Sequence, residues 1–524
     1  MIPNTHNSLF NYTWQLLNED KTLQAFEKIL ANRDLDEKIR DPWDFSDMKK
    51  AVDRIKKAIG NKERIMIFGD YDADGITSAA ILLRVLKEMG AEVSCRIPHR
   101  EDDGYGLNMK FVDEFIKADV KLLITVDCGI ACPHEIKKAE DNGIDTIVTD
   151  HHEVPLVPAE PYAIIHSRDL AGAGVAYKLA CALLGDEAEK YIDLAAIGTI
   201  ADVVPLTGEN RVIATKGLKK MAETSWPGLE ALIKVSQIDK KDFLELDSHT
   251  VGYRIGPRLN ASGRLGDPYL SLKILISDDE KVMSMVEQLN QINIDRQDLV
   301  RGILNDLKYD KNDSIIVIKG DWPKGVLGLI SGRITEETGK PSVVLMEDGD
   351  MLTGSARSPE FFHITEAFQK LDEYLEEYGG HRKAAGLTFK KENFEIFSSK
   401  LKKMLSLDEI PPKTLKIDAQ VEPSELGKDF YEKLESLKPY GEANAQPILK
   451  FENVLITKAR IVGQKQNHLS IEGKFGQKDI KGILFNVPAE VDIAGKTVSI
   501  AAKIKKDTFA PDGYGLQVED VMVC

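Results

Sequence analysis

The sequence predicts an α/β protein made of a doubly wound parallel sheet, a helical connector, a second and smaller α/β domain, and a C-terminal β-barrel. Three observations predict this order. Apolar strand-like runs alternate with helical patterns from residue 64 to residue 203 and again from about 311 to 405, which is typical of a parallel sheet covered by helices. The intervening stretch is helical and charged. Beyond residue 412, short alternating strands with turn residues between them favour a small barrel.

The chain length of 524 residues fits several domains, since one domain commonly takes about 100–200 residues. We expect a leader at 1–45, the first α/β domain at 46–205, the connector at 206–310, the second α/β domain at 311–408 and the barrel at 409–524. No apolar run reaches the ~18 residues of a membrane span, and the N-terminal residues show neither a basic start nor a long apolar core. We therefore expect a cytoplasmic protein without a signal peptide.

The net charge of −16 counts against a protein that coats DNA through bulk electrostatics. It does not exclude a nuclease, because carboxylates that hold metal ions carry negative charge that the metal offsets. Five cysteines in a chain of this length do not form a disulfide framework. We expect all five to be reduced thiols.

The first α/β domain opens with a helix. Ser46 is its predicted N-cap, and Gly60 its predicted end. Strands are expected at 64–69, 92–97, 121–126 and 144–149. Helices are expected at 76–89, 108–117 and 131–142, followed by a largely apolar helical run at 174–203. Ligands of a doubly wound sheet bind beyond the carboxyl ends of its strands, so the residues that follow these strands are the first candidates for a site.

The stretch from Ile65 to Ser78, IMIFGDYDADGITS, is an apolar strand followed by Asp70, Asp72 and Asp74 on alternate residues. Such a cluster of carboxylates is costly unless cations neutralise it. A calcium loop of the EF-hand type is one alternative, but it needs a Glu where the chain has Ile81 and a helix where the chain has a strand. A plain acidic turn is the other alternative, and on this stretch alone it is as well supported as a metal site.

Polar residues also follow the other predicted strands. The second strand is followed by His99-Arg100, the third ends at Asp127, and the fourth ends at Asp150-His151-His152. Because the ends of parallel strands meet at one edge of a sheet, this convergence favours a metal site. Asp202 stands inside an apolar run, where a carboxylate is rarely unpaired. We interpret it as a further ligand, with a helix cap as the alternative.

Two stretches of the later chain stand out by their glycines. GPRLNASGRL (256–265) is too rich in glycine and arginine for a helix interior, and we expect it to interrupt the connector. Strands of the second α/β domain are expected at 314–318, 342–346 and 352–358, with a helix at 325–339. Gly379-Gly380-His381 is interpreted as a glycine turn, which either presents backbone N–H groups to an anion or is purely structural.

The predicted barrel is locally basic. Residues 450 to 481 include seven basic residues and three acidic ones. In an acidic protein this surplus favours a surface that faces a polyanion. A solvated strand face is the alternative.

In order along the chain, DYDADG, TVDCG, DHH and the Asp202 element resemble the four motifs of the DHH phosphoesterase superfamily. Further stretches, such as PHREDDGYGL (98–107), AGAGVAYKL (171–179), LNQINIDRQ (289–297), GSARS (354–358) and GGHRKAAG (379–386), are similar to its RecJ branch, the single-strand-specific 5′→3′ exonucleases. The similarity runs from about residue 30 to the C-terminus. The departures are AIIHSRDLAGAG after DHH, Trp322-Pro323-Lys324, and PYGEANAQP; they affect the shape of a substrate groove and no presumed metal ligand.

The resemblance implies a metal-dependent exonuclease that degrades single-stranded DNA 5′→3′ to mononucleotides, in DNA repair and recombination, with two divalent cations, Mn²⁺ or Mg²⁺. Carboxylates with imidazoles suit these metals. Asp127 would bridge the two ions, Asp72 would bind one, and Asp74, His151 and Asp202 would bind the other. The implied catalytic neighbours, which hold water or phosphate oxygens, are Asp70 and His152.

The resemblance also implies substrate contacts. Arg100 and Tyr105 would lie near the 5′ end, and Arg258 or Arg264 would contact the backbone. The residues that would hold a phosphate opposite the metals are Ser355, Arg357 and His381. The barrel would be an OB-fold that tracks single-stranded DNA.

Two other functions remain open. A DHH phosphodiesterase for short oligonucleotides or cyclic dinucleotides would match only residues up to about 405. A non-catalytic replication scaffold would lack metal carboxylates, whereas this chain has them all. The exonuclease is favoured, as a monomer without membrane association, with a helicase and a single-strand-binding protein as candidate partners.

Overall fold

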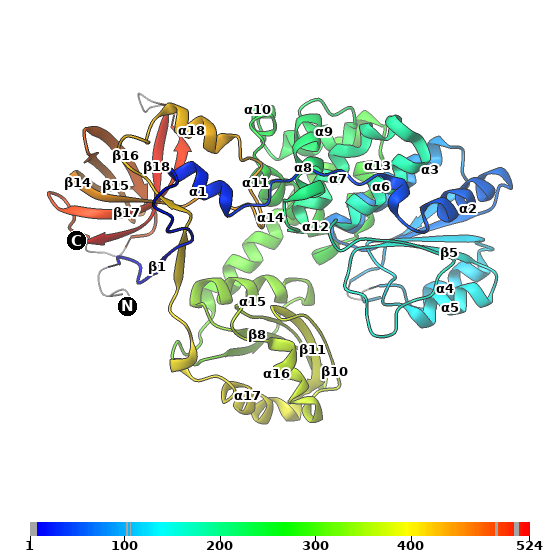
Figure 1. Cartoon of the computed structure of the whole chain (residues 1–524). Helices are drawn as coiled ribbons and strands as arrows, with labels where there is room; N and C mark the ends of the chain where they lie inside the picture. Colours follow the sequence, from blue (N-terminus) through cyan, green and yellow to red (C-terminus); the bar gives the residue numbers. More distant parts are fainter. Residues whose placement is uncertain (1–7, 101–102, 105, 488–490, 508–512, 524) are drawn as a thin grey trace. The chain divides into compact units, whose positions relative to one another are not determined.

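The computed structural model describes residues 8–100, 103–104, 106–487, 491–507 and 513–523. The chain forms two compact units, of which one holds residues 36–410 and the other holds residues 1–35 together with 411–524 (Figure 1). Within the described residues, no helix is both long enough and apolar enough to cross a membrane. The predicted fold class, with two α/β parts, a helical connector and a barrel, is confirmed.

The larger unit begins with a five-stranded, all-parallel sheet in the order β3-β2-β4-β5-β6. Its strands are β2 Ile65–Gly69, β3 Val93–Arg96, β4 Leu122–Val126, β5 Asp145–Asp150 and β6 Ala163–His166. Its helices are α2 Met48–Gly60, α3 Ala73–Glu88, α4 Met109–Lys117, α5 Pro133–Asp141, α6 Gly172–Leu184 and α7 Ile192–Ala201. All five residues of β4 are buried, as expected when helices cover both faces of a parallel sheet.

The four predicted strands are confirmed, and three details differ. The N-cap of α2 is Asp47 instead of Ser46, and the Asp47 carboxylate accepts the Ile164 N–H of β6 at 3.0 Å instead of capping the helix. β6 was not predicted; it is a four-residue strand at the edge of the sheet, paired with β5 alone. The apolar run at 174–203 is two helices, since Gly185 ends α6 with a φ of 63°.

A helical segment follows, as predicted. Its α-helices are α8 Gly208–Met221, α9 Pro227–Val235, α10 Lys240–Leu244, α11 Ser248–Thr250, α12 Gly256–Leu265, α13 Tyr269–Ile276 and α14 Met283–Asp306. A π-helical turn, Val251–Ile255, leads into α12. The expectation that GPRLNASGRL is not helical is wrong: it forms the whole of α12. Pro257 lies in the first turn, where proline is tolerated, and the glycines lie where other chain segments approach closely.

The second sheet has the order β10-β11-β9-β8-β7, in which only β7 and β8 are parallel. Its strands are β7 Ile316–Gly320, β8 Ser342–Asp348, β9 Met351–Arg357, β10 Glu377–Gly380 and β11 Ala384–Lys390, and its helices are α15 Lys324–Thr338, α16 Ile364–Gln369 and α17 Phe394–Lys402. The predicted glycine turn is wrong in part: Gly379 and Gly380 belong to β10 and pair with β11. Without side chains they still complete a strand because their partners supply the backbone hydrogen bonds.

The smaller unit contains a five-stranded barrel of β14 to β18, in which β14 pairs with both β15 and β17 and so closes the sheet; β13 extends this sheet beside β14, and β1 and β12 form a separate pair. Its strands are β1 Thr13–Leu16, β12 Thr414–Ile417, β13 Ala419–Gln420, β14 Leu449–Val462, β15 His468–Phe475, β16 Lys478–Leu484, β17 Thr497–Lys506 and β18 Tyr514–Val523, with helices α1 Ala25–Ala31 and α18 Lys428–Glu435. The N-terminal segment belongs to this unit: β1 pairs with β12, and Ala25 and Ile29 lie in the barrel core.

Candidate metal centre and substrate cleft

The sheet brings the predicted acidic residues to one edge. β2 and β4 are in register, with Gly69 opposite Val126, so Asp70 and Asp127 follow neighbouring strand ends. Asp127 has a φ of 58°, which residues other than glycine rarely adopt. The chain therefore turns sharply at Asp127, where the backbone N–H still donates to the Thr149 carbonyl of β5 at 3.0 Å.

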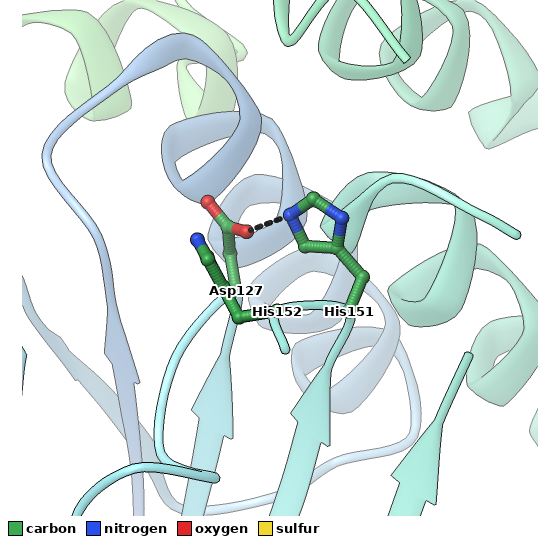
Figure 2. A group of neighbouring side chains, drawn as sticks. All are labelled: Asp127, His151 and His152. Atoms are coloured by element: carbon green, nitrogen blue, oxygen red, sulfur yellow. Dashed lines mark ion pairs between the residues drawn. The ribbon is translucent and has the colours of Figure 1, made fainter. Parts of the chain in front are cut away.

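Three overlapping groups of potential metal ligands meet at this edge. Ligand atoms within 4.8 Å of one another come from Asp70, Asp72 and Asp127 in the first group, from Asp74, His151 and Asp202 in the second, and from Asp127, His151 and His152 in the third. Figure 2 shows the third group, in which His151 Nε2 lies 3.1 Å from Asp127 Oδ1; these two residues join the first group to the second. His151 Nε2 also lies 3.8 Å from Asp74 Oδ2 and 3.7 Å from Asp202 Oδ2.

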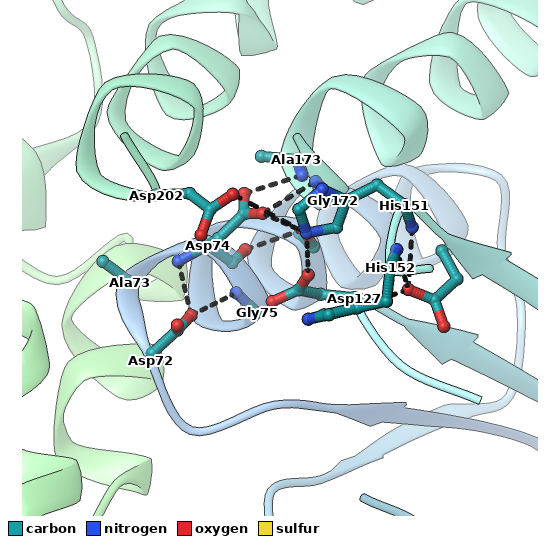
Figure 3. Close-up of polar contacts among 12 residues, drawn as sticks. Asp72, Ala73, Asp74, Gly75, Asp127, His151, His152, Gly172, Ala173 and Asp202 are labelled. Carbon is teal, nitrogen blue, oxygen red and sulfur yellow. Dashed lines mark hydrogen bonds and ion pairs between the residues drawn. The ribbon is translucent and has the colours of Figure 1, made fainter. Parts of the chain in front are cut away.

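The N-termini of two helices hold the acidic turn. Asp72 is the N-cap of α3, where its Oδ1 accepts the N–H groups of Asp74 and Gly75 at 2.9 and 3.1 Å. Asp74 accepts the N–H groups of Gly172 and Ala173, at the start of α6, at 2.7 and 2.8 Å (Figure 3). Anionic side chains are stabilised at such helix starts, so the backbone fixes both carboxylates in place.

Two glycines leave space for these carboxylates. A Cβ added at Gly172 would lie 2.6 Å from Asp127 Oδ1, and one at Gly198 would lie 2.5 Å from Asp74 Oδ1. The AGAGVAYKL stretch contributes to the family resemblance, but its sequence does not predict that Gly172 leaves space for a carboxylate. A glycine beside a carboxylate is recognisable only once the fold shows which helix approaches it.

The carboxylates raise one another's proton affinity. Burial, followed by the charge of Asp72, raises the pKa of Asp74 to about 7. Burial, followed by the charge of Asp74, raises the pKa of Asp202 to about 8. Burial raises the pKa values of Asp70 and Asp127 well above their usual range. Burial also lowers the pKa of His151 to about 4, which leaves a neutral imidazole that can bind a metal.

His152 differs from its neighbour in charge. Its Nδ1 lies 2.8 Å from Asp150 Oδ1, and Asp150 is fully enclosed. Burial alone would lower the pKa of His152, but the hydrogen bond to Asp150 and its charge raise it to about 9. Asp150 also accepts the N–H groups of Ile130, His151 and His152. Asp150 thus orients the two histidines, a role that the sequence did not reveal.

The ligand set fits divalent cations. The buried Oδ1 of Asp70 accepts no hydrogen bond from any residue that the structure describes, and the buried Oδ1 of Asp127 has the His151 imidazole 3.1 Å away. Buried carboxylate oxygens without donors are costly unless a cation supplies the missing charge. Oxygen ligands with one or two imidazoles suit Mn²⁺ and Mg²⁺ better than metals that prefer thiolates. Cys95, Cys128, Cys132 and Cys181 are free thiols, and Cys524 lies outside the described residues.

A cavity of about 1040 Å³ opens beside this centre within the larger unit. Tyr71 and Arg100 line it from the first sheet's loops, with the Arg100 guanidinium 5.1 Å from the Tyr71 ring centre. Ser355 and Arg357 line it from β9, and the Arg357 guanidinium donates to Ser355 Oγ at 3.1 Å. Lys324, at the start of α15, lines it as well and was not among the predicted site residues. Glu376 and Glu377 also line the cavity, but Arg100, Lys324 and Arg357 give it three cationic groups that suit a phosphate.

The other predicted substrate residues are placed differently. Arg258 donates to Asn290 Oδ1 at 3.0 Å and to the Arg254 carbonyl at 2.6 Å. Arg264 donates to the Gly325 carbonyl at 3.1 Å, and burial lowers its pKa to about 10. The side chain of His381 is 66% exposed and lies 3.7 Å from Glu153, outside the residues that line the cavity. Tyr105 lies outside the described residues.

The predicted basic surface of the barrel is partly neutralised. Each of its three acidic residues pairs with a lysine of the same stretch, in the pairs Lys450–Glu452, Lys458–Glu472 and Lys474–Asp479. The remaining excess of basic residues stays a candidate for binding a polyanion.

Family models match three parts of the chain. The DHH family N-terminal domain matches residues 64–199, the DHHA1 domain residues 298–407, and the RecJ OB domain residues 417–518. The single-stranded-DNA-specific exonuclease RecJ of Thermus thermophilus is 34% identical over 469 residues, which cover 86% of this chain and 68% of that protein. The chain belongs to the RecJ family.

A second relative and a solved structure extend this similarity. The single-stranded-DNA-specific exonuclease RecJ of Bacillus subtilis is 35% identical over 92% of this chain, and the match spans 64% of that relative's length. The crystal structure of Thermus thermophilus RecJ in complex with Mn²⁺ superposes with a TM-score of 0.83 at 28% identity, covering 98% of this chain and 79% of that one. The match to a RecJ protein thus runs through both α/β sheets and the barrel.

Proposed function

We propose that this chain is a metal-dependent exonuclease that degrades single-stranded DNA 5′→3′ to mononucleotides, in DNA repair and recombination. The observation that carries the proposal is the set of overlapping ligand groups around Asp127. They lie beside a cavity that Arg100, Lys324 and Arg357 line. The RecJ relatives support it, since each is named a single-stranded-DNA-specific exonuclease. The five-part domain division and a cytoplasmic, monomeric state, with a helicase and a single-strand-binding protein as partners, remain part of the proposal.

The residues divide the work of binding two cations. Asp72 and Asp127, with Asp70 beside them, would hold the first. Asp74, His151 and Asp202 would hold the second, with Asp127 shared. When bound, Mn²⁺ or Mg²⁺ supplies the positive charge that activates a water molecule and offsets the charge of the leaving oxygen.

The remaining residues orient the DNA. Asp150 maintains the positive charge of His152. This charge attracts a non-bridging oxygen of the scissile phosphate. Arg357, Ser355 and Lys324 bind the terminal 5′ phosphate on the opposite wall of the cavity. When both phosphates are held, the phosphodiester bond to be cut lies beside the carboxylates. This fixed orientation lowers the activation barrier of hydrolysis.

The test compares Asp127→Ala with Asp53→Ala, which changes an exposed carboxylate on α2. Both proteins are mixed with 5′-labelled and 3′-labelled single strands in the presence of Mn²⁺. We expect Asp127→Ala to lose about 10³-fold or more in rate, while Asp53→Ala cleaves normally and the 5′ label is released first as a mononucleotide. Full activity of a folded Asp127→Ala protein would reject the metal assignment, and release from the 3′ end would reject the polarity.

A further inference from the structure

Helix α12 contacts three helices that carry parts of the site, namely α3, α7 and α15. α3 begins at the Asp72 cap, α7 ends directly before Asp202, and α15 begins at Lys324 in the cavity. One short helix therefore lies against both the metal-binding side and the cationic side of the cleft. Its unusual composition becomes understandable from these contacts.

On the metal side, α12 holds the acidic turn. Asn260 Oδ1 accepts the Ala73 N–H at 2.7 Å, between Asp72 and Asp74. A Cβ added at Gly263 would lie 2.7 Å from the Tyr71 carbonyl, and one at Gly256 would lie 3.0 Å from Ala201 Cβ. The acidic turn and the end of α7 thus approach α12 closely at its glycines, where even a methyl group would be crowded.

On the opposite side, the end of α12 holds the start of α15. The Arg264 guanidinium donates to the Gly325 carbonyl at 3.1 Å, and a Cβ added at Gly325 would lie 2.1 Å from the Arg264 carbonyl. One turn further along α15, a Cβ added at Gly328 would lie 3.1 Å from an Arg357 guanidinium nitrogen. α15 therefore packs directly against the Arg357 guanidinium.

We propose that α12 fixes the distance between the metal cluster and the Arg357–Ser355 pair, and that this distance sets how many nucleotides each cut releases. The inference rests on the proposed function. The terminal phosphate binds at one wall and the scissile phosphate at the other, so the separation of the two walls counts the nucleotides between them. Asn260, Gly263 and Gly325 are positioning residues in this scheme.

The test is Gly325→Ala, with Gly332→Ala as its matched control. Both glycines lie in α15, but a Cβ at Gly332 has no atom within 4 Å, so only the first substitution moves α15 away from α12. A single strand carrying a ³²P 5′ phosphate is digested with Mn²⁺, and the length of the first labelled product is measured. We expect wild type and Gly332→Ala to give one product length, and Gly325→Ala to raise the share of longer products about tenfold, since a shift of about 1 Å is enough to alter rates strongly.

Two further measurements keep the test decisive. Mn²⁺ affinity, measured by calorimetry, should be unchanged in Gly325→Ala, because α15 supplies no ligand to any of the three groups. Asn260→Ala removes one contact without a clash and should broaden the product lengths in the same direction, even if Gly325→Ala does not fold. If the wild type digests strands while folded Asn260→Ala and any folded Gly325→Ala keep its single product length, the α12 inference fails and the proposed function stands. If the wild type releases nothing from any strand, the proposed function itself fails.

Discussion

At Asp202, the metal binding that we propose and the stability of the metal-free protein oppose each other. It lies at the C-terminal end of α7, and its pKa is raised to about 8 by burial and the charge of Asp74. A carboxyl whose folded pKa is raised contributes stability below its unfolded pKa near 4, and that contribution is lost as pH rises toward 8. Without metal, Asp202 therefore lowers the stability of the folded protein increasingly as pH rises from about 4 to about 8.

We predict that, in excess chelator, Asp202→Asn raises the free energy of unfolding by roughly 1–2 kcal/mol. The variant should also lose most of the further stabilisation that Mn²⁺ gives to the wild type. Calorimetry at pH 6 and pH 9 with chelator measures this, and the gain should be larger at pH 9. A loss of stability in chelator would contradict the prediction.

Asp193 provides the matched control. It is also buried with a raised pKa, but its carboxylate accepts hydrogen bonds from Thr224 Oγ1 at 2.9 Å and Trp226 Nε1 at 3.1 Å. Asp193→Asn should destabilise the protein, because it weakens satisfied hydrogen bonds. It should leave the stabilisation by Mn²⁺ unchanged. The contrast would distinguish Asp202, which we propose binds a metal ion, from Asp193, whose carboxylate stabilises the fold.

At the scale of elements, the contact between α7 and α3 controls the second ligand group. Gly198 lies in α7, and a Cβ there would approach Asp74 Oδ1, Thr77 Oγ1 and Ala173 Cβ, each to 2.5 Å. We predict that Gly198→Ala lowers Mn²⁺ affinity about tenfold or more and costs roughly 1–3 kcal/mol of stability. Gly60→Ala, in α2 with open space around it, should change neither. Equal metal affinities for the two variants, measured by calorimetry, would show that the Asp74 carboxylate adapts.

The elements also show what sequence reasoning can reach. The strands that carry Asp70, Asp127 and Asp150 were predictable, because apolar runs and the parallel arrangement dictate where their ends lie. Helix α12 was not, since its glycines lower helix propensity and the contacts that compensate come from residues distant in sequence, such as Tyr71 and Gly325. Lys324 belongs to a stretch that departs from the family pattern, and no local signal places it in the cavity. Local pattern thus predicts the candidate ligands, while tertiary packing determines which residues support them.

At the scale of the whole molecule, the N-terminal segment is part of the barrel unit. The buried Asp520 accepts hydrogen bonds from Ser8 Oγ, from Phe10 N–H at 3.1 Å and from Trp14 Nε1 at 2.7 Å. Arg33 pairs with Asp418 at 3.0 Å. Because both ends of the chain build one unit, removing the C-terminal residues alone would leave the segment up to residue 35 without its partners and expose Ile29, which the barrel core covers.

We therefore predict that a fragment of residues 36–410 folds and keeps its metal centre, whereas residues 1–410 aggregate or lose solubility. The fragment should cleave very short oligonucleotides at nearly the rate of the whole chain, since every presumed ligand lies within it. It should bind long single strands about tenfold or more weakly, because each base stacked on a barrel is worth about 1–3 kcal/mol. This difference should shrink as salt screens the contacts of the whole chain.

Circular dichroism first establishes that the fragment is folded, and fluorescence anisotropy with oligonucleotides of increasing length then measures affinity. Equal losses on short and long strands would mean that the barrel unit supports the active site instead of extending the path of the DNA.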